Sequence, residues 1–201
     1  ADGYTLFVGS NASMAANVAL YKQLGYDPIR ELTPVAMMIR APWVLVTSVN
    51  SPWSTIDALV AAGKRDPKLL SSGDGSAGFQ MATAMFANMT GLEINQALYK
   101  GSAPAIQDLA GNQVSLAIVD LSSALPLIKG GRLRPLLAMT NERIAMLPEV
   151  PSVKEKAYGS MPLHSWAGVF VKAGTPPELV ERMSALFQKA MESAAYTKYV
   201  A

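Results

Sequence analysis

The sequence has few of the residues on which catalysis and metal binding most often depend. Its 201 residues include no cysteine and a single histidine, His164. Without thiols there are no disulfides, cysteine-ligated metals or cysteine nucleophiles, and one histidine cannot build a histidine metal site. No Gly-x-Ser-x-Gly turn accompanies His164, so we interpret this histidine as structural or ligand-lining rather than as a base. We therefore expect no enzyme, no metal and no cofactor.

Charge is also scarce, and both signs are mixed along the chain. Charged residues make up 16% of the sequence, the formal net charge is +2, and lysines and arginines occur singly or in pairs such as Lys64-Arg65. Nucleic-acid binding usually needs a clustered basic stripe, so we expect no nucleic-acid partner. No run of about 18 apolar residues predicts a membrane-spanning helix. Half of the residues are nevertheless hydrophobic, which is enough for one large domain or two small lobes.

Short apolar segments alternate with amphipathic ones along most of the chain. We expect strands at 5–8, 34–38, 43–47, 69–72, 96–99, 114–119, 134–139 and 166–171. We expect helices at 13–21, 56–64, 79–89, 153–157 and 178–191, one more that begins near Pro104, and one that ends near Ile128. This alternation predicts an α/β fold of mostly parallel sheets with helices on both faces.

Some local patterns refine this prediction. Ser54 is typical of a helix N-cap. Met81, Met85 and Met89 recur at every fourth residue and favour core packing over an exposed, adaptable surface. The apolar residues of segment 178–191 have the spacing of a helix with one buried face.

Small polar residues follow four of the expected strands, at 9–11, 72–76, 100–102 and 120–122. In an open parallel sheet such turns gather at the carboxyl ends of the strands, where ligands bind. Backbone N–H groups at a helix N-terminus attract an anion, and glycine lets a ligand approach the backbone closely. The same residue types are common in ordinary caps and turns. One turn alone therefore favours a structural role, whereas four together favour ligand contacts at some of them.

Individual side chains in these turns have two interpretations. Lys100 would pair with a carboxylate or be simply solvated, and Asp120 would accept a hydrogen bond from a ligand or cap its own helix. The tryptophans would line a cleft or pack within a lobe; they are Trp43, Trp53 and Trp166.

A Gly-x-Gly-x-x-Gly pattern at Gly73–Gly78 gives the second functional hypothesis, a nucleotide-dependent α/β enzyme. Glu93 lies near the place where a ribose-binding acid is expected. Against this hypothesis, Asp74 would put a negative charge beside the pyrophosphate. The sequence has turns suited to holding an anion and no credible catalytic set, and so favours a binding protein.

An ordered series of short motifs covers nearly the whole chain. They are DGYTL at 2–6 with GS at 9–10, ALY at 19–21 with YDP at 26–28, TPV at 33–35, SGDGS at 72–76, YKGSAPA at 99–105, Asp120 with SSALP at 122–126, LPEVP at 147–151, and SWAG at 165–168 with GTP at 174–176. In order and spacing they resemble the extracytoplasmic solute receptors of tripartite tricarboxylate transporters, the Bug-type binding proteins.

The resemblance implies a two-lobed periplasmic-binding fold of type II, with lobe 1 at 1–42 plus 166–201 and lobe 2 at 43–165. It implies a periplasmic monomer that closes its lobes on a small organic carboxylate or acidic amino acid. The ligand would then pass to a membrane permease, although a sensor role stays open. It also implies a stretch before Ala1, with a signal peptide, and a last helix after Tyr199. This sequence contains neither, which would leave lobe 1 incomplete.

The resemblance further implies a set of ligand contacts. They are Ser10, Asn11, Ser72, Gly73, Asp74, Gly75, Ser76, Lys100, Gly101, Asp120, Ser122 and Trp166. One departure concerns the segment after the second turn, where family members often have a histidine and this chain has Phe79-Gln80. This difference favours a less polar ligand.

Overall fold

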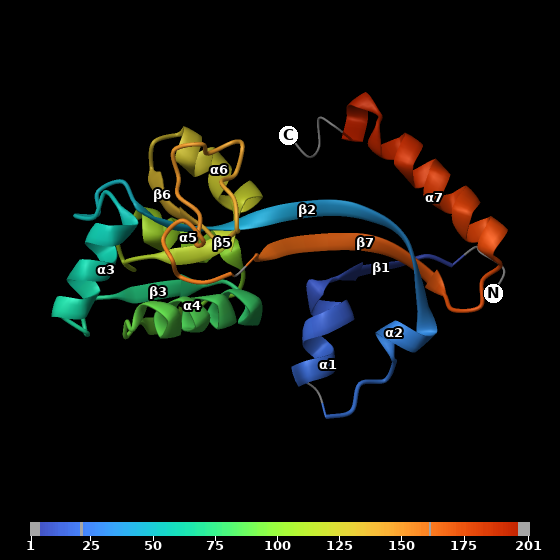
Figure 1. The fold of residues 1–201 in the computed structure, drawn as a ribbon, viewed down its shortest axis with the longest axis horizontal. Coiled ribbons are helices and arrows are strands. Elements are labelled where there is room, and N and C mark those ends of the chain that lie inside the picture. The colour runs from blue at the N-terminus through green and yellow to red at the C-terminus, as the bar shows by residue number, and fades with distance from the viewer. Residues whose placement is uncertain (1–4, 21, 161, 197–201) are drawn as a thin grey trace. The chain divides into compact units, whose positions relative to one another are not determined.

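The structure, a computed structural model, describes residues 5–20, 22–160 and 162–196 (Figure 1). The chain forms two compact units. Unit 1 comprises Ala1–Arg40 and Ser165–Ala201, and unit 2 comprises Ala41–His164. Strands β2 (Leu32–Ser48) and β7 (His164–Lys172) carry the chain from one unit to the other.

Unit 2 is built on a sheet in which a parallel pair of strands and a group of three strands are joined by one isolated bridge. Strand β3 (Ser71–Asp74) is parallel to β4 (Asn95–Leu98), and on its other side Ser72 forms a parallel bridge with Leu116 just before β5 (Ala117–Asp120). Strand β2 runs antiparallel both to β5 and to β6 (Leu133–Ala138). The predicted mostly parallel arrangement therefore holds among β3, β4 and β5 but not at β2, and the ladder of unit 1 at residues 7–10 is antiparallel as well. Strand β2 enters unit 2 directly from unit 1, and its direction in the sheet is set by that entry.

Strand β2 also differs from the two separate strands that we predicted at 34–38 and 43–47. It is one strand of 17 residues that runs through Pro42. The register with β5 begins at Trp43, so the missing N–H of Pro42 removes no bond from that ladder. The residue before a proline prefers an extended backbone, and Ala41 therefore continues the strand.

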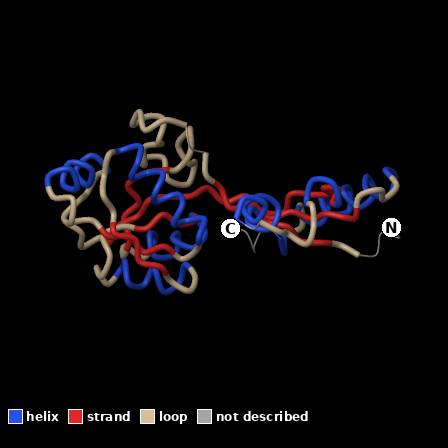
Figure 2. Tube along the Cα trace, turned by 90° about the horizontal axis from the view of Figure 1, so that it is seen from below, coloured by secondary structure: helices blue, strands red, loops and turns tan. Residues whose placement is uncertain are grey.

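Helices cover both faces of the unit 2 sheet, as Figure 2 shows. They are α3 (Ile56–Arg65), α4 (Ala77–Thr90), α5 (Ser102–Ala110) and α6 (Leu121–Lys129). Successive side chains of β2 enter two different cores: Leu45 packs with residues of α3 and α4, and Val44 packs with residues of α5 and α6. The two-residue period of the strand thus assigns one core to each face of the sheet.

Unit 1 is smaller and buries less. Strand β1 (Phe7–Ser10) pairs antiparallel with β7, which lies beside β2. A π-helical turn (Ala12–Ala16), α1 (Asn17–Leu20), α2 (Pro28–Glu31) and α7 (Pro177–Met191) complete its helices. Its cluster of buried hydrophobic residues contains Val35, Val169 and Val171. The predicted helix at 13–21 is found as two short pieces, and its last residue, Tyr21, lies outside the described residues.

Three local predictions differ from the structure. Thr55, not Ser54, caps α3, with its hydroxyl oxygen accepting the Ala58 N–H at 3.2 Å. Segment 153–157 forms turns instead of a helix, because Ala157 has a φ of 57° and leaves the helical region after one turn. The predicted buried face of α7 is only half-buried: Val180, Met183 and Phe187 touch the unit 1 core and no residue of the helix is fully buried.

The methionines of α4 lie on the surface, where we had predicted core packing. Met81, Met85 and Met89 are 55%, 38% and 36% exposed. Helix α4 already buries Phe79, Ala82 and Phe86 against the sheet, and the methionines fall on the opposite side. When both sides of a helix are apolar, spacing alone cannot tell which side is buried.

Candidate functional site

The turn between β3 and α4 holds five of the predicted contacts. Ser72, Gly73 and Asp74 are buried in β3, Gly75 is half-buried, and Ser76 is exposed at the N-cap of α4. The hydroxyl oxygen of Ser76 accepts the Phe79 N–H at 3.3 Å. The turn therefore places the N-terminus of a 14-residue helix at an exposed position, as an anion site requires.

The side chain of Asp74 points into the protein, not toward a ligand. Its Oδ1 accepts the Thr83 hydroxyl at 2.8 Å and its Oδ2 accepts the Ser72 hydroxyl at 3.1 Å. Burial raises the pKa of this carboxyl, and the two hydroxyl hydrogen bonds oppose the rise. Because both oxygens are occupied, only the backbone of Asp74 remains a predicted contact.

The next turn, between β4 and α5, lies directly against the first. A Cβ on Gly75 would stand 2.6 Å from both the Gly101 carbonyl carbon and the Ser102 nitrogen. Gly101 has a φ of 106°, a conformation open to glycine, and forms the N-cap of α5. The Tyr99 N–H donates to the Asp74 carbonyl at 2.9 Å and joins the two turns on the strand side. The structure thus brings together two of the turns that the sequence singled out.

Lys100 precedes this junction and is exposed. It has no hydrogen bond or ion pair with any other residue that the structure describes. Its ammonium is therefore available, which suits both interpretations, pairing with a carboxylate and simple solvation.

The turn after β5 has a different role from the first two. The carboxylate of Asp120 caps α6: it accepts the Ser123 N–H at 2.9 Å and the hydroxyls of Ser122 at 2.6 Å and Ser123 at 3.0 Å. Of the two interpretations, capping accounts for this side chain. The carboxylate has little capacity left for a ligand, and Ser122 donates its hydroxyl proton within the turn.

Unit 1 holds the remaining predicted contacts, Ser10, Asn11 and Trp166. Ser10 ends β1 and pairs with Ala167 of β7, so it lies next to Trp166 along the sheet. The Ser10 N–H donates to the Ser13 hydroxyl at 2.9 Å. The Trp166 ring is tilted against Phe170, with their centroids 6.4 Å apart. The β1–β7 register therefore gathers these three residues at one end of the two strands.

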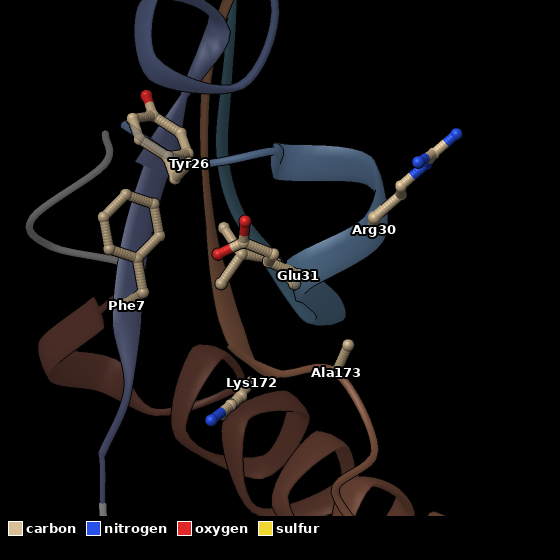
Figure 3. A pocket seen from close by; sticks show the side chains of 7 residues that line it. Phe7, Tyr26, Arg30, Glu31, Lys172 and Ala173 are labelled. Carbon is tan, nitrogen blue, oxygen red and sulfur yellow. The ribbon is translucent and has the colours of Figure 1, made fainter. Parts of the chain in front are cut away.

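Unit 1 also contains a pocket of about 570 Å³ that sequence reasoning missed (Figure 3). Its lining comprises Phe7, Tyr26, Arg30, Glu31, Leu32, Lys172 and Ala173. Figure 3 shows Arg30 pointing away from the two aromatic rings. The lining comes from β1, the segment of Tyr26, α2, the start of β2 and the end of β7, so the pocket is assembled from parts of the chain that are distant in sequence.

Residues 5–20, 22–160 and 162–196 contain neither a metal cluster nor a membrane-spanning helix. No cluster of three or more histidine, aspartate or glutamate side chains in these segments has the geometry of a metal site. None of their helices has both the length and the apolar character of a membrane span.

Comparison with known proteins shows which family the sequence belongs to. The sequence model of the tripartite tricarboxylate transporter family receptors matches residues 1–201. The chain belongs to this receptor family. Among its relatives is the protein BugT of Bordetella pertussis, which is 33% identical over 198 residues. The match covers 97% of this chain and 61% of BugT, so the chain spans about three fifths of that relative's length.

Solved structures of similar proteins agree with the fold. The R. palustris protein Rpa4515 with adipate superposes with a TM-score of 0.84 at 32% identity, covering 98% of this chain and 67% of that one. A periplasmic transporter superposes with a TM-score of 0.85 at 28% identity, with the same coverage of both chains. The predicted α/β fold of the periplasmic-binding type and the predicted receptor family are confirmed.

Proposed function

We propose that this chain is the ligand-binding part of an extracytoplasmic solute receptor, one that captures a small organic carboxylate and delivers it to a membrane permease. The observation that carries the proposal is the junction of two helix N-termini at Gly75 and Gly101 beside the free Lys100. Rpa4515, a relative at 32% identity, has adipate in its structure, and adipate belongs to the proposed ligand class.

The physical basis of carboxylate binding is the set of N–H groups at the start of α4 and α5. A hydrogen bond to a charged group contributes roughly 1.5–3 kcal/mol. The positive ends of the two helix dipoles add about 0.3–1 kcal/mol each at an exposed position. Lys100 adds an exposed charge pair of about 0.2–1 kcal/mol. Backbone donors therefore dominate, and they recognise a carboxylate group irrespective of the rest of the molecule.

The wider role follows from family membership. In this proposal unit 1 and unit 2 are the two predicted lobes, and Ser10, Asn11 and Trp166 are the proposed contacts from unit 1. Because the Asp120 carboxylate is already occupied as a helix cap, the α6 turn contributes backbone N–H groups near Ser122 instead of this side chain. The receptor is a periplasmic monomer that binds its ligand without transforming it, and an acidic amino acid also belongs to the candidate ligand class.

Calorimetry and thermal shift with a ligand panel test this proposal. The panel contains adipate, malate, citrate, glutamate, NAD and ATP. A carboxylate at 100 times its Kd stabilises the protein by about 2.7 kcal/mol, a clear rise in melting temperature. Lys100→Ala is expected to weaken binding by up to about fivefold, whereas Lys129→Ala, which changes an exposed lysine at the far end of α6, leaves it unchanged.

The outcomes separate the two functional hypotheses. Binding of one carboxylate class without nucleotides supports the receptor. Binding of NAD or ATP alone, abolished by Gly75→Val, supports the nucleotide-dependent enzyme at Gly73–Gly78 and refutes the proposal. No binding by any member of the panel also counts against it.

A further inference from the structure

Asp74 is a buried carboxyl that the proposed site does not use for direct contact. Both Asp74 and its partner Thr83 are fully buried. A carboxyl group in such a place is unfavourable unless hydrogen bonds replace the lost water. Here the hydroxyls of Thr83 and Ser72 supply one bond to each oxygen, at 2.8 and 3.1 Å.

These bonds connect the elements that form the two anion-binding turns. The Thr83 bond joins the end of β3 to the second turn of α4, and the Asp74 carbonyl accepts the Tyr99 N–H from the end of β4. The Tyr99 hydroxyl in turn donates to Asp108 of α5 at 2.8 Å. Asp74 is therefore tied directly to β4 and α4, and through Tyr99 to α5.

The residue after Asp74 has almost no freedom to move. Gly75 lies so close to the backbone of Gly101 and Ser102 that even a Cβ would overlap with it. A shift of Asp74 would carry the Gly75 peptide into, or away from, the start of α5. Because anion binding depends on where these N–H groups point, a small rotation is enough to weaken it.

We propose that Asp74 and Thr83 are positioning residues of the carboxylate site, whose buried hydrogen bond holds the first N–H groups of α4 against those of α5. The inference rests on the proposed function, and it adds a pair of residues that never touches the ligand. It also assigns a role to Thr83, which lies outside every motif noted in the sequence.

The test uses variants of two threonines on the same helix. Thr83→Val removes the hydroxyl at nearly constant shape and leaves Asp74 Oδ1 without this donor, while Thr83→Ser keeps the hydroxyl. Thr90→Val is the matched control: Thr90 is buried near the end of α4, and its hydroxyl donates to the Phe86 carbonyl at 2.7 Å. Both valine variants lose a buried hydrogen bond, but only the first loses one beside the site.

Two readouts separate positioning from general stability. The Kd for whichever panel carboxylate binds the wild type is expected to rise about tenfold in Thr83→Val, from the loss of one hydrogen bond to a charged group, and to stay within about twofold in Thr83→Ser and Thr90→Val. Amide hydrogen exchange at Phe79, Gln80 and Tyr99, whose N–H groups donate hydrogen bonds to Ser76 and Asp74 within the turns, is expected to be about tenfold faster in Thr83→Val than in Thr90→Val.

The exchange measurement needs no ligand, so the inference and the proposed function fail separately. If no carboxylate binds the wild type, the function is refuted, and local acceleration at these three amides still supports the positioning role. Equal affinity and equal exchange in Thr83→Val and Thr90→Val would overturn the inference even where the wild type binds a carboxylate. Failure of Thr83→Ser to restore either readout would overturn it as well.

Discussion

Replacing Gly75 by alanine tests the junction of the two turns more directly than any other single change. The added Cβ would stand 2.6 Å from the Gly101 carbon and the Ser102 nitrogen, where ordinary contacts begin near 3.4 Å. The overlap is with backbone on both sides, so no flexible side chain can rotate away. One turn must move by most of an ångström, and such overpacking costs about 1–3 kcal/mol of unfolding free energy.

The same substitution three residues later is a matched control. A Cβ on Gly78 would meet the Trp43 ring at 3.5 Å, an ordinary contact, and Gly78 lies in the first turn of α4. Gly78→Ala is therefore expected to be neutral or to stabilise the protein by up to about 1 kcal/mol. Both variants add one methyl group within the same Gly-x-Gly-x-x-Gly segment.

Urea denaturation and calorimetric titration with a bound carboxylate measure the two effects. Gly75→Ala is expected to lower the unfolding free energy and to raise the Kd for the carboxylate at least about tenfold, because the N–H groups of α4 and α5 no longer converge. Gly78→Ala is expected to keep both values. A Gly75→Ala variant as stable as the wild type and with unchanged affinity would show that the two turns do not form one site.

Three further predictions concern Asp74, Asp120 and the surface of α4. Burial raises the pKa of Asp74 above its ordinary 3.8, so the folded state holds this proton more tightly than the unfolded state. The unfolding free energy should fall as pH rises from about 3.8 through the raised pKa and then level off. Urea denaturation of Asp74→Asn at a series of pH values should not show this fall, and identical pH profiles of variant and wild type would contradict the prediction. Asp120→Ala should lose about 1 kcal/mol of stability as a lost helix cap, and no loss in urea denaturation would argue against the capping role. Met81→Glu should change stability by no more than about 0.5 kcal/mol, whereas Phe86→Ala should lose about 3–5 kcal/mol; the reverse order in thermal melts would contradict the placement of the two faces.

Family membership and most secondary structure could be read from the sequence, because their signals are local or ordered along the chain. The strand–helix alternation predicted most elements of unit 2 to within a few residues, although the helix expected at 153–157 is absent there. Ser76 and Asp120 cap α4 and α6 through contacts no more than three residues away. Interactions of such short range depend on the nearest residues and little on the rest of the fold.

The tertiary structure decided the rest. Gly75 and Gly101 are 26 positions apart, and they meet because β3 and β4 are parallel neighbours whose following turns emerge at the same edge. The same packing turned Asp74 inward and the methionines of α4 outward. The direction of β2 likewise depended on how the chain enters unit 2. The sequence by itself determined which residues can bind an anion, whereas folding determined which of their groups remain free to do so, because burial and pairing depend on segments distant in the chain.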